Sequence, residues 1–297
     1  MEITNIGPVS VKDVPITKIN AFNSEAVLDM LSVEEPLEIK ILYGPENQRT
    51  QKNISVTMRT PGNDHELATG FLFTEGIIPS YSIIKEVSHL AGQCTRQKQN
   101  SIQVELREDF IPQLMQADRN FYTTSSCGVC GKSSIESIKT VSAFSVKNKT
   151  VLHLSREILS QLPHKLRTAQ TDFSNTGGIH ASGLFSVDGD LILLREDVGR
   201  HNALDKLIGS ALSADLLPLN KHILLLSGRA SFELIQKAAM ARISAVAAIG
   251  APSSLAVDLA KEFNMTLIGF LREDRFNVYN SSDVAPILIS DLENKTV

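Results

Sequence analysis

The chain has 297 residues, of which 42% are hydrophobic and 21% charged, the composition of an ordinary globular protein with a sizeable core. Its formal net charge of −4 argues against broad electrostatic binding to nucleic acid or acidic lipid, although a local basic pocket is compatible with it. No apolar run reaches the roughly 20 residues that span a bilayer, and residues 1–20 lack a basic segment followed by an apolar core. We therefore expect neither a membrane span nor a signal peptide. The three cysteines suit a reducing cytosol better than a disulfide scaffold.

The first 120 residues are β-rich. Apolar and polar residues alternate, as they do in half-buried strands, in the stretches 36–44, 51–60 and 100–108. Residues 61–78 carry a helical pattern, with Asp64 placed to cap its N-terminus and Gly76 to end it. We therefore predict a smaller, β-rich N-terminal domain over residues 1–120.

The second half alternates apolar runs of strand length with amphipathic helical patterns. The apolar runs are 191–197, 222–227, 245–250 and 265–271, and the helical stretches between them are 201–212, 232–243 and 255–263. This alternation is the βαβ pattern of a mostly parallel sheet with helices packed on its faces. Residues 121–297 are therefore predicted to form an α/β domain that also contains the loop with two cysteines.

Three loops are predicted to lie at the carboxyl edge of that sheet, where open α/β folds bind their ligands. They are 227–231, 251–254 and 272–275. The first two place small and hydroxyl residues before a helix, where free N–H groups and the helix dipole favour anions. Taken singly, each loop is better explained by ordinary helix capping through Ser227, Ser231 or Ser253. Together they favour a phosphate-bearing ligand, because they add the guanidinium groups of Arg229, Arg272 and Arg275, although no glycine fingerprint such as GxGxxG is present.

Two further stretches are dense in polar residues or glycine. In "REDVGRHNALDK" (195–206), eight of the twelve residues are charged, His or Asn. A solvated turn explains some of this polarity, while Arg200 and His201 are also placed to face a ligand; for His201, a structural and a catalytic role both stay open. In "NTGGIHASGLF" (175–185), the glycine pair indicates a tight turn or a close backbone approach, and His180 is either a ligand contact or a core histidine.

The segment "TTSSCGVCGKSS" (123–134) holds Cys127 and Cys130 among glycines. A structural zinc site needs two more ligands, and no second CxxC pair exists, so we predict no metal here. Zinc deaminases carry H-x-E before P-C-x-x-C, whereas the nearest match, "HAS", follows the cysteines and has Ser182 in place of the glutamate. A thioredoxin-like centre follows an early strand, unlike this mid-chain loop. A nucleophilic thiolate that carries sulfur, favoured by the nearby Lys132, and a loop-ordering role for the cysteines both remain.

Several stretches together resemble one family, the formate dehydrogenase accessory sulfurtransferases (the FdhD family). They are "TGFLFTEGII", "SSCGVCGK", "TGGIHASGLF", "REDVGRHNALDKLIG", "SGRASFELIQKAAMARI" and "GAPSSLAVDLAKEFNMTLIGFLRE". The CxxC alone is a weak signal, but the set covers most of the chain and is highly specific. The resemblance implies an α/β fold similar to that of cytidine deaminases, a mixed sheet flanked by helices, without their zinc chemistry.

The resemblance also implies a function. Members of the family take persulfide sulfur from a cysteine desulfurase and pass it to the molybdenum cofactor, Mo-bis(molybdopterin guanine dinucleotide), which a formate dehydrogenase requires. The carrier residue of the family matches Cys127, and the cofactor-binding stretch matches Phe270, Leu271, Arg272, Glu273, Asp274 and Arg275. A cytoplasmic homodimer is expected, with no nucleic-acid or membrane partner. The alternative is a chaperone that only binds and inserts the cofactor, with a structural CxxC.

Overall fold

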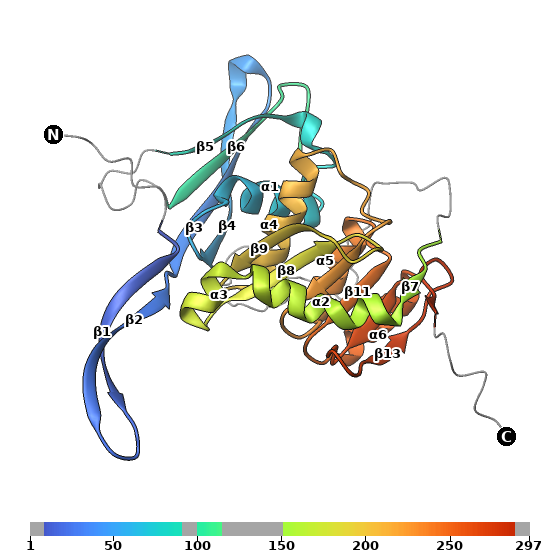
Figure 1. Cartoon of the computed structure of the whole chain (residues 1–297). Coiled ribbons are helices and arrows are strands. Elements are labelled where there is room, and N and C mark those ends of the chain that lie inside the picture. Colours follow the sequence, from blue (N-terminus) through green and yellow to red (C-terminus); the bar gives the residue numbers. More distant parts are fainter. Residues whose placement is uncertain (1–8, 91–99, 115–150, 289–297) are drawn as a thin grey trace.

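A six-stranded sheet forms the centre of the C-terminal part of the molecule (Figure 1). The computed structural model describes residues 9–90, 100–114 and 151–288. The strands lie in the order β13 (Asn277–Asn280), β12 (Thr266–Gly269), β11 (Ala245–Ala248), β10 (Ile223–Leu226), β8 (His180–Phe185) and β9 (Leu191–Asp197). The predicted mixed α/β sheet is confirmed. Parallel pairing is confined to β10, β11 and β12, so the expectation of a mostly parallel sheet holds only at its centre.

Helices cover both faces of this sheet, and the alternation of side chains along the strands decides which helix each residue meets. Leu224 and Leu226 of β10 join the apolar cluster that contains α4 (Arg200–Ser213), α5 (Phe232–Met240) and α6 (Ser254–Glu262). Ile223 and Leu225 point the other way and join the cluster of α2 (Arg156–Ala169), whose buried residues are Leu159, Leu162 and Leu166. The central strands β10, β11 and β12 are therefore buried on both sides, which explains why they are continuous apolar runs.

The β-rich part is a second sheet of four strands. Their order is β4 (Thr50–Arg59), β3 (Glu35–Tyr43), β6 (Ser101–Leu106) and β5 (Ile84–His89). Leu37, Ile39 and Ile41 of β3 are fully buried, and the residues between them are partly exposed, as the alternating sequence predicts. Short 3-10 turns at Glu46–Gln48 and Tyr81–Ile83 link the strands, and α1 (Asp64–Thr74) follows β4. The predicted strands and helix are confirmed, whereas β5 was not predicted.

The N-cap of α1 lies one residue earlier than predicted. Asn63, with a left-handed φ of 57°, is the N-cap, and Asp64 is the first helical residue. The carboxylate of Asp64 does not cap the helix, because it accepts two hydrogen bonds of 3.0 Å from the buried guanidinium of Arg59. Gly76 follows the helix at a φ of 72°, a conformation that suits glycine, so its predicted role at the end of the helix is confirmed.

The four-stranded and the six-stranded sheets share one apolar core, because α1, which follows β4, crosses α4, which follows β9. Glycine allows the close approach: a Cβ on Gly70 would lie 1.9 Å from the carbonyl oxygen of Asp205, and a Cβ on Gly209 would lie 1.9 Å from that of Glu66. A single cluster of buried residues consequently runs from β3 and β6 through the two helices to β10 and β11. The predicted division at residue 120 falls outside the described residues and stays a prediction.

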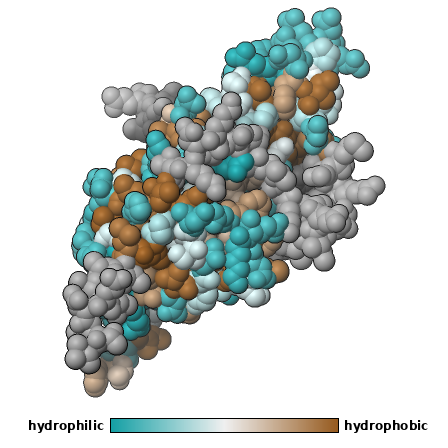
Figure 2. Space-filling view, turned by 90° about the vertical axis from the view of Figure 1, so that its right-hand side faces the viewer, coloured by the Kyte–Doolittle hydropathy of each residue, from teal (hydrophilic) through white to brown (hydrophobic). Residues whose placement is uncertain are grey.

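A two-stranded hairpin, β1 (Val11–Ile19) and β2 (Ser24–Ser32), extends away from this body (Figure 1). Its base is attached to the short helix α3 (Thr171–Thr176) by a hydrogen bond of 2.8 Å between the hydroxyls of Ser32 and Thr176. A further short pair, β7 (Leu154–Ser155) and β14 (Ile287–Leu288), joins the start of α2 to the end of the described chain. On the side of the molecule that carries α6 and β13, apolar and polar residues form adjoining patches (Figure 2), and Leu255 and Val278 are exposed.

Candidate functional site

The loops after β10, β11 and β12 lie side by side at one edge of the central sheet. The N–H of Gly250 donates to the carbonyl of Gly228 over 2.9 Å, and the N–H of Phe270 donates to the carbonyl of Gly250 over 3.1 Å. A parallel bridge pairs Ala230 with Pro252. The prediction that these three loops share the carboxyl edge of the sheet is therefore confirmed.

The three serines of these loops have three different roles. Ser253 caps α6 by accepting a hydrogen bond of 3.2 Å from the N–H of Ala256. The hydroxyl of Ser227 accepts from the N–H of Ala181, at the start of β8, over 2.8 Å. Ser231 is the N-cap residue of α5, but its side chain makes no cap hydrogen bond. Ordinary capping, the simpler interpretation of these loops, thus applies only to Ser253.

Ser231 interacts instead with a histidine from another helix. Its hydroxyl lies 3.4 Å from Nε2 of His201, in the first turn of α4, and the same nitrogen lies 3.9 Å from a carboxylate oxygen of Glu233. Burial alone would raise the pKa of Glu233, but hydrogen bonds from His201, its own backbone N–H and Ser231 outweigh it and hold that pKa at about 2. Both contacts use Nε2 of His201, so the three residues do not form the relay of a Ser-His-acid triad.

His180 lies at the same edge, because β8 runs antiparallel to β10 and begins where β10 ends. Its ring packs against the loop after β10: a Cβ on Gly228 would lie 3.3 Å from Nδ1 of His180. Burial lowers the pKa of His180, the positive charges of Arg200 and His201 lower it further, and Asp197 opposes them. The side chain therefore favours the neutral imidazole, and it lies within electrostatic reach of the start of α4.

The stretch 270–275 has one buried residue and five exposed ones. Leu271 is fully buried in the core on the α2 side, so it supports the edge and cannot contact a ligand there. Phe270 is 41% exposed and has a φ of 53°, which is strained for a bulky residue. Arg272 donates from one Nη atom to the carbonyls of Ile249 and Leu271, both over 2.8 Å.

Four of the eight polar residues of the stretch 195–206 are buried and the other four are partly buried, so the solvated-turn interpretation is wrong for the buried four. Asp197 is fully buried, with its carboxylate 2.7 Å from Nζ of Lys206. It also accepts hydrogen bonds from the N–H groups of Thr60 and Gly199, over 3.1 and 2.8 Å, and from the amide of Asn202. A buried carboxylate is stable only when its charge and its lone pairs are satisfied in this way.

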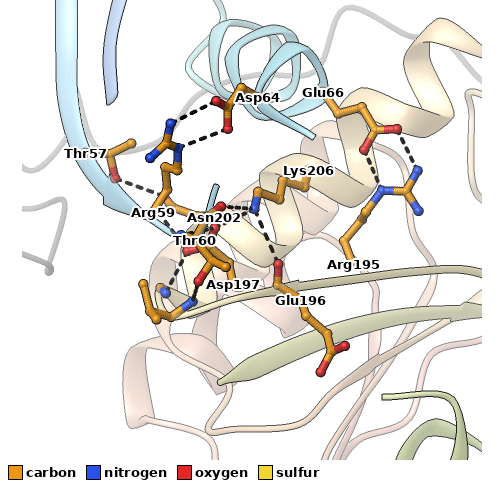
Figure 3. Close-up of polar contacts among 12 residues, drawn as sticks. Thr57, Arg59, Thr60, Asp64, Glu66, Arg195, Glu196, Asp197, Asn202 and Lys206 are labelled. Atoms are coloured by element: carbon orange, nitrogen blue, oxygen red, sulfur yellow. Dashed lines mark hydrogen bonds and ion pairs between the residues drawn. The ribbon is translucent and has the colours of Figure 1, made fainter. Parts of the chain in front are cut away.

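This network fixes the start of α4 to the end of β4. Asn202 donates to the carbonyl of Met58 over 2.7 Å and accepts from the hydroxyl of Thr57 over 3.0 Å. Lys206 donates to the carbonyl of Thr60 over 2.8 Å. Further along, Arg195 forms a bidentate ion pair with Glu66 of α1 (Figure 3). The network therefore fixes the start of α4, formed by Arg200 and His201, to the four-stranded N-terminal sheet. His201 contacts Ser231 in the loop after β10, so this start lies at the sheet edge.

The cysteines lie outside the described residues. Cys127 and Cys130, which the sequence singles out, and the isolated Cys94 all fall in the stretches that the structure does not describe. Within residues 9–90, 100–114 and 151–288, no group of three or more His, Cys, Asp or Glu side chains is arranged to hold a metal ion. Over the same part of the chain, no helix has the length and apolar character of a membrane span.

The fold belongs to a class already represented among solved structures. A crystal structure of a formate dehydrogenase accessory protein from Desulfotalea psychrophila superposes with a TM-score of 0.68, covering 92% of this chain and 98% of that one. The two sequences are 23% identical, so this match supports the arrangement of helices and strands. The likeness to cytidine deaminases stays a prediction.

The sequence comparisons then give the family. The model of the FdhD/NarQ family matches residues 33–285, and the chain belongs to this family. A relative from Mycolicibacterium paratuberculosis, called "Sulfur carrier protein FdhD", is 48% identical over 271 residues, which cover 90% of this chain and 96% of the relative. A protein of the same name from Streptomyces avermitilis is 46% identical over 253 residues, with 84% and 87% covered. The predicted family is confirmed.

Proposed function

We propose that this protein is a sulfur carrier that serves a formate dehydrogenase, and that Cys127 carries the sulfur. The observation that supports this most strongly is the match along nearly the whole chain to relatives named as sulfur carriers, at up to 48% identity. The sequence supplies a thiol for the role in "CGVC", with glycines around it and Lys132 close by to favour the thiolate.

In the proposed reaction the Cys127 thiolate attacks the terminal sulfur of a persulfide on a cysteine desulfurase. A new sulfur–sulfur bond forms on Cys127, the bond in the donor breaks, and the donor cysteine leaves as a thiolate. The protein is then a sulfurtransferase with a cysteine persulfide intermediate. It passes the terminal sulfur to the molybdenum cofactor, Mo-bis(molybdopterin guanine dinucleotide), which it holds as cargo for the dehydrogenase; the sulfur–sulfur bond breaks, Cys127 leaves as the thiolate, and the reduced cofactor supplies the two electrons that convert the sulfur to sulfide. No resident metal is part of the proposal.

We place the cofactor at the edge that the stretch 270–275 shares with the loops after β10 and β11. The ring of Phe270 is the exposed aromatic surface of that stretch, and an aromatic face can stack on a base such as guanine. The proposed carrier works in the cytoplasm as a homodimer. Its partners are the cysteine desulfurase and the formate dehydrogenase.

The test replaces Cys127 and measures the client enzyme. In a strain without its own copy of this protein, the Cys127→Ala chain should leave formate dehydrogenase inactive, and a matched Cys94→Ala chain should restore activity. If Cys127→Ala restores activity as well as the unaltered chain, Cys127 is not the carrier. Loss of activity in Phe270→Ala together with a fully active Cys127→Ala would support a chaperone that only binds and inserts the cofactor.

A further inference from the structure

The hairpin of β1 and β2, residues 11–32, is an arm that extends away from the body (Figure 1). Within the described part of the chain, none of its residues belongs to either apolar cluster of the body. Hydrogen bonds hold its base to α3: Ser10 donates to Asp172 over 3.1 Å, and the hydroxyl of Ser32 lies 2.8 Å from that of Thr176. An isolated two-stranded hairpin is only marginally stable in water, so the arm needs a surface that covers it.

The two faces of the arm differ in chemistry, because side chains alternate along each strand and cross-strand pairs share a face. One face carries four charged residues, Lys12, Lys18, Glu25 and Asp29. The other face has one charged residue, Asp13, near the base, and its exposed apolar residues are Pro15, Ile19, Ala26, Leu28 and Met30. Ile19 and Leu28 are 76% and 71% exposed. The arm is therefore amphipathic, and a single copy of the chain leaves its apolar face in water.

The tip of the arm is an ordered turn that presents an aromatic ring. The side-chain oxygen of Asn20 accepts hydrogen bonds from the N–H groups of Phe22 and Asn23, over 2.9 and 3.0 Å. The N–H of Asn20 also donates to the carbonyl of Asn23 over 3.0 Å. This turn holds Phe22 98% exposed. Large aromatic side chains are common anchors of protein interfaces, so the tip has the character of a docking element.

A second exposed apolar surface follows the arm directly. Two residues separate β2 from β3, and the ladder of β3 and β4 places Pro36 opposite Met58. Val56 and Met58 are 53% and 47% exposed, and with Pro36 they lie on the face of the sheet opposite to the buried Leu37. β4 is an edge strand of the described sheet, a position at which another strand can be added.

The sizes of these surfaces favour a second copy of the chain as the cover. The arm is nine residue pairs long and two strands wide, about 30 Å by 10 Å, so one face has about 300 Å². Two arms packed on each other would bury about 600 Å², below the roughly 1,200 Å² of a stable interface. Two arms that each lie on the partner's β3–β4 sheet make two separate contacts and reach about 1,200 Å². A client that departs after each cycle would instead leave the apolar face in water.

We propose that the arm of one chain packs on the β3–β4 sheet of a second copy, and that the second arm makes the same contact about a two-fold axis near residues 33–34. The apolar face of each arm then covers the patch of Pro36, Val56 and Met58 on the other chain, and the charged face stays in water. This inference specifies the homodimer of the proposed function and rests on it, but it does not depend on sulfur transfer by Cys127.

The test measures the dissociation constant of the dimer by sedimentation equilibrium of the full chain. Leu28→Asp on the arm and Val56→Lys on the sheet should each raise that constant about a thousandfold, because an interface hot spot is worth at least about thirtyfold and a two-fold axis repeats each change. Leu31→Asp is the matched control: it makes the same change on the same strand but on the opposite face, so the constant should change little. Thermal unfolding checks that each variant is folded, which is expected because none of the three residues belongs to the apolar clusters.

Photo-crosslinking locates the contact. With p-benzoylphenylalanine in place of Leu28, in an equal mixture of isotopically heavy and light chains, crosslinked peptides should join position 28 of one copy to β4 of the other. The proposal is overturned if Leu28→Asp dimerises as tightly as the unaltered chain, or if position 28 crosslinks only to another segment or to formate dehydrogenase. A dimer that survives both variants refutes the arm contact alone, a chain that stays monomeric refutes the homodimer as well, and neither result bears on the sulfur carried by Cys127.

Discussion

The crossing of α1 and α4 predicts that Gly209→Ala destabilises the protein. In an isolated helix this change would add up to about 1 kcal/mol of stability, because alanine has the higher helix propensity. In this protein the new methyl would lie 1.9 Å from the carbonyl oxygen of Glu66 and 2.9 Å from the N–H nitrogen of Gly70, both backbone atoms of the facing helix. Neither atom can rotate away.

The structure sets the size of the effect. To bring the methyl from 1.9 Å to an ordinary contact of about 3.4 Å, the helices must move apart by about 1.5 Å over the core that joins the two sheets. Overpacking of a core typically costs about 1–3 kcal/mol, and rigid backbone on the facing side places this site at or above the upper end. With an m-value of about 3 kcal/mol per molar, the midpoint of urea unfolding should fall by about 1 M.

Circular dichroism during urea unfolding measures the effect. Ser160→Ala on the exposed face of α2 is the matched control, because it also adds helix propensity but contacts nothing across a helix pair; its midpoint should change little. Gly70→Ala should resemble Gly209→Ala, and the double variant should cost less than the sum, because helices already separated by one methyl have room for the second. A Gly209→Ala midpoint equal to or above that of the unaltered chain would refute the close crossing.

Three further outcomes follow from the described contacts. Asp205→Ala removes the nearer carboxylate, 2.9 Å from the buried ammonium of Lys237, and leaves only Glu75, 3.4 Å away, as an acidic partner. It should lower the free energy of unfolding by about 3 kcal/mol in urea titrations, and no recovery on adding Lys237→Met would count against the pairing. The pKa of Glu233 is lowered from 4.5 to about 2, so its charged form stabilises the fold above pH 4.5 and that contribution is lost as pH falls toward 2. Glu233→Gln should therefore flatten the fall in melting temperature in that window, and an unchanged slope would contradict the assignment. Ser253→Ala removes the cap of α6 and should cost about 1 kcal/mol, whereas the neighbouring Ser254→Ala should cost little; equal losses would argue against the cap.

Local patterns in the sequence predicted those parts of the fold that depend on burial along a single element. β3 and β6 were found because their buried residues alternate, and the edge loops because parallel strands end at a common edge. The hairpin β1–β2 was not predicted, because its residues are mostly exposed and leave no alternation of burial. β5 was missed for a similar reason: one of its six residues is buried.

The site was harder to predict, because its side chains are paired across long stretches of sequence. Thr60, whose N–H donates to Asp197, lies 137 positions away, so the polarity of the stretch 195–206 gave no sign that half of its polar residues are buried. Ser231 and Ser253 carry the same local capping signal, yet Ser253 caps its helix and Ser231 faces His201 of another helix. Only the three-dimensional arrangement separates these cases.

The most direct test of the sulfur-carrier role is mass spectrometry of the protein after incubation with a cysteine desulfurase and cysteine. The account predicts that the peptide with Cys127 gains the mass of one sulfur atom, that a thiol reductant removes this sulfur, and that Cys127→Ala gains none. Sulfur that accumulates on Cys94, or no added sulfur in a preparation that activates formate dehydrogenase, would contradict it.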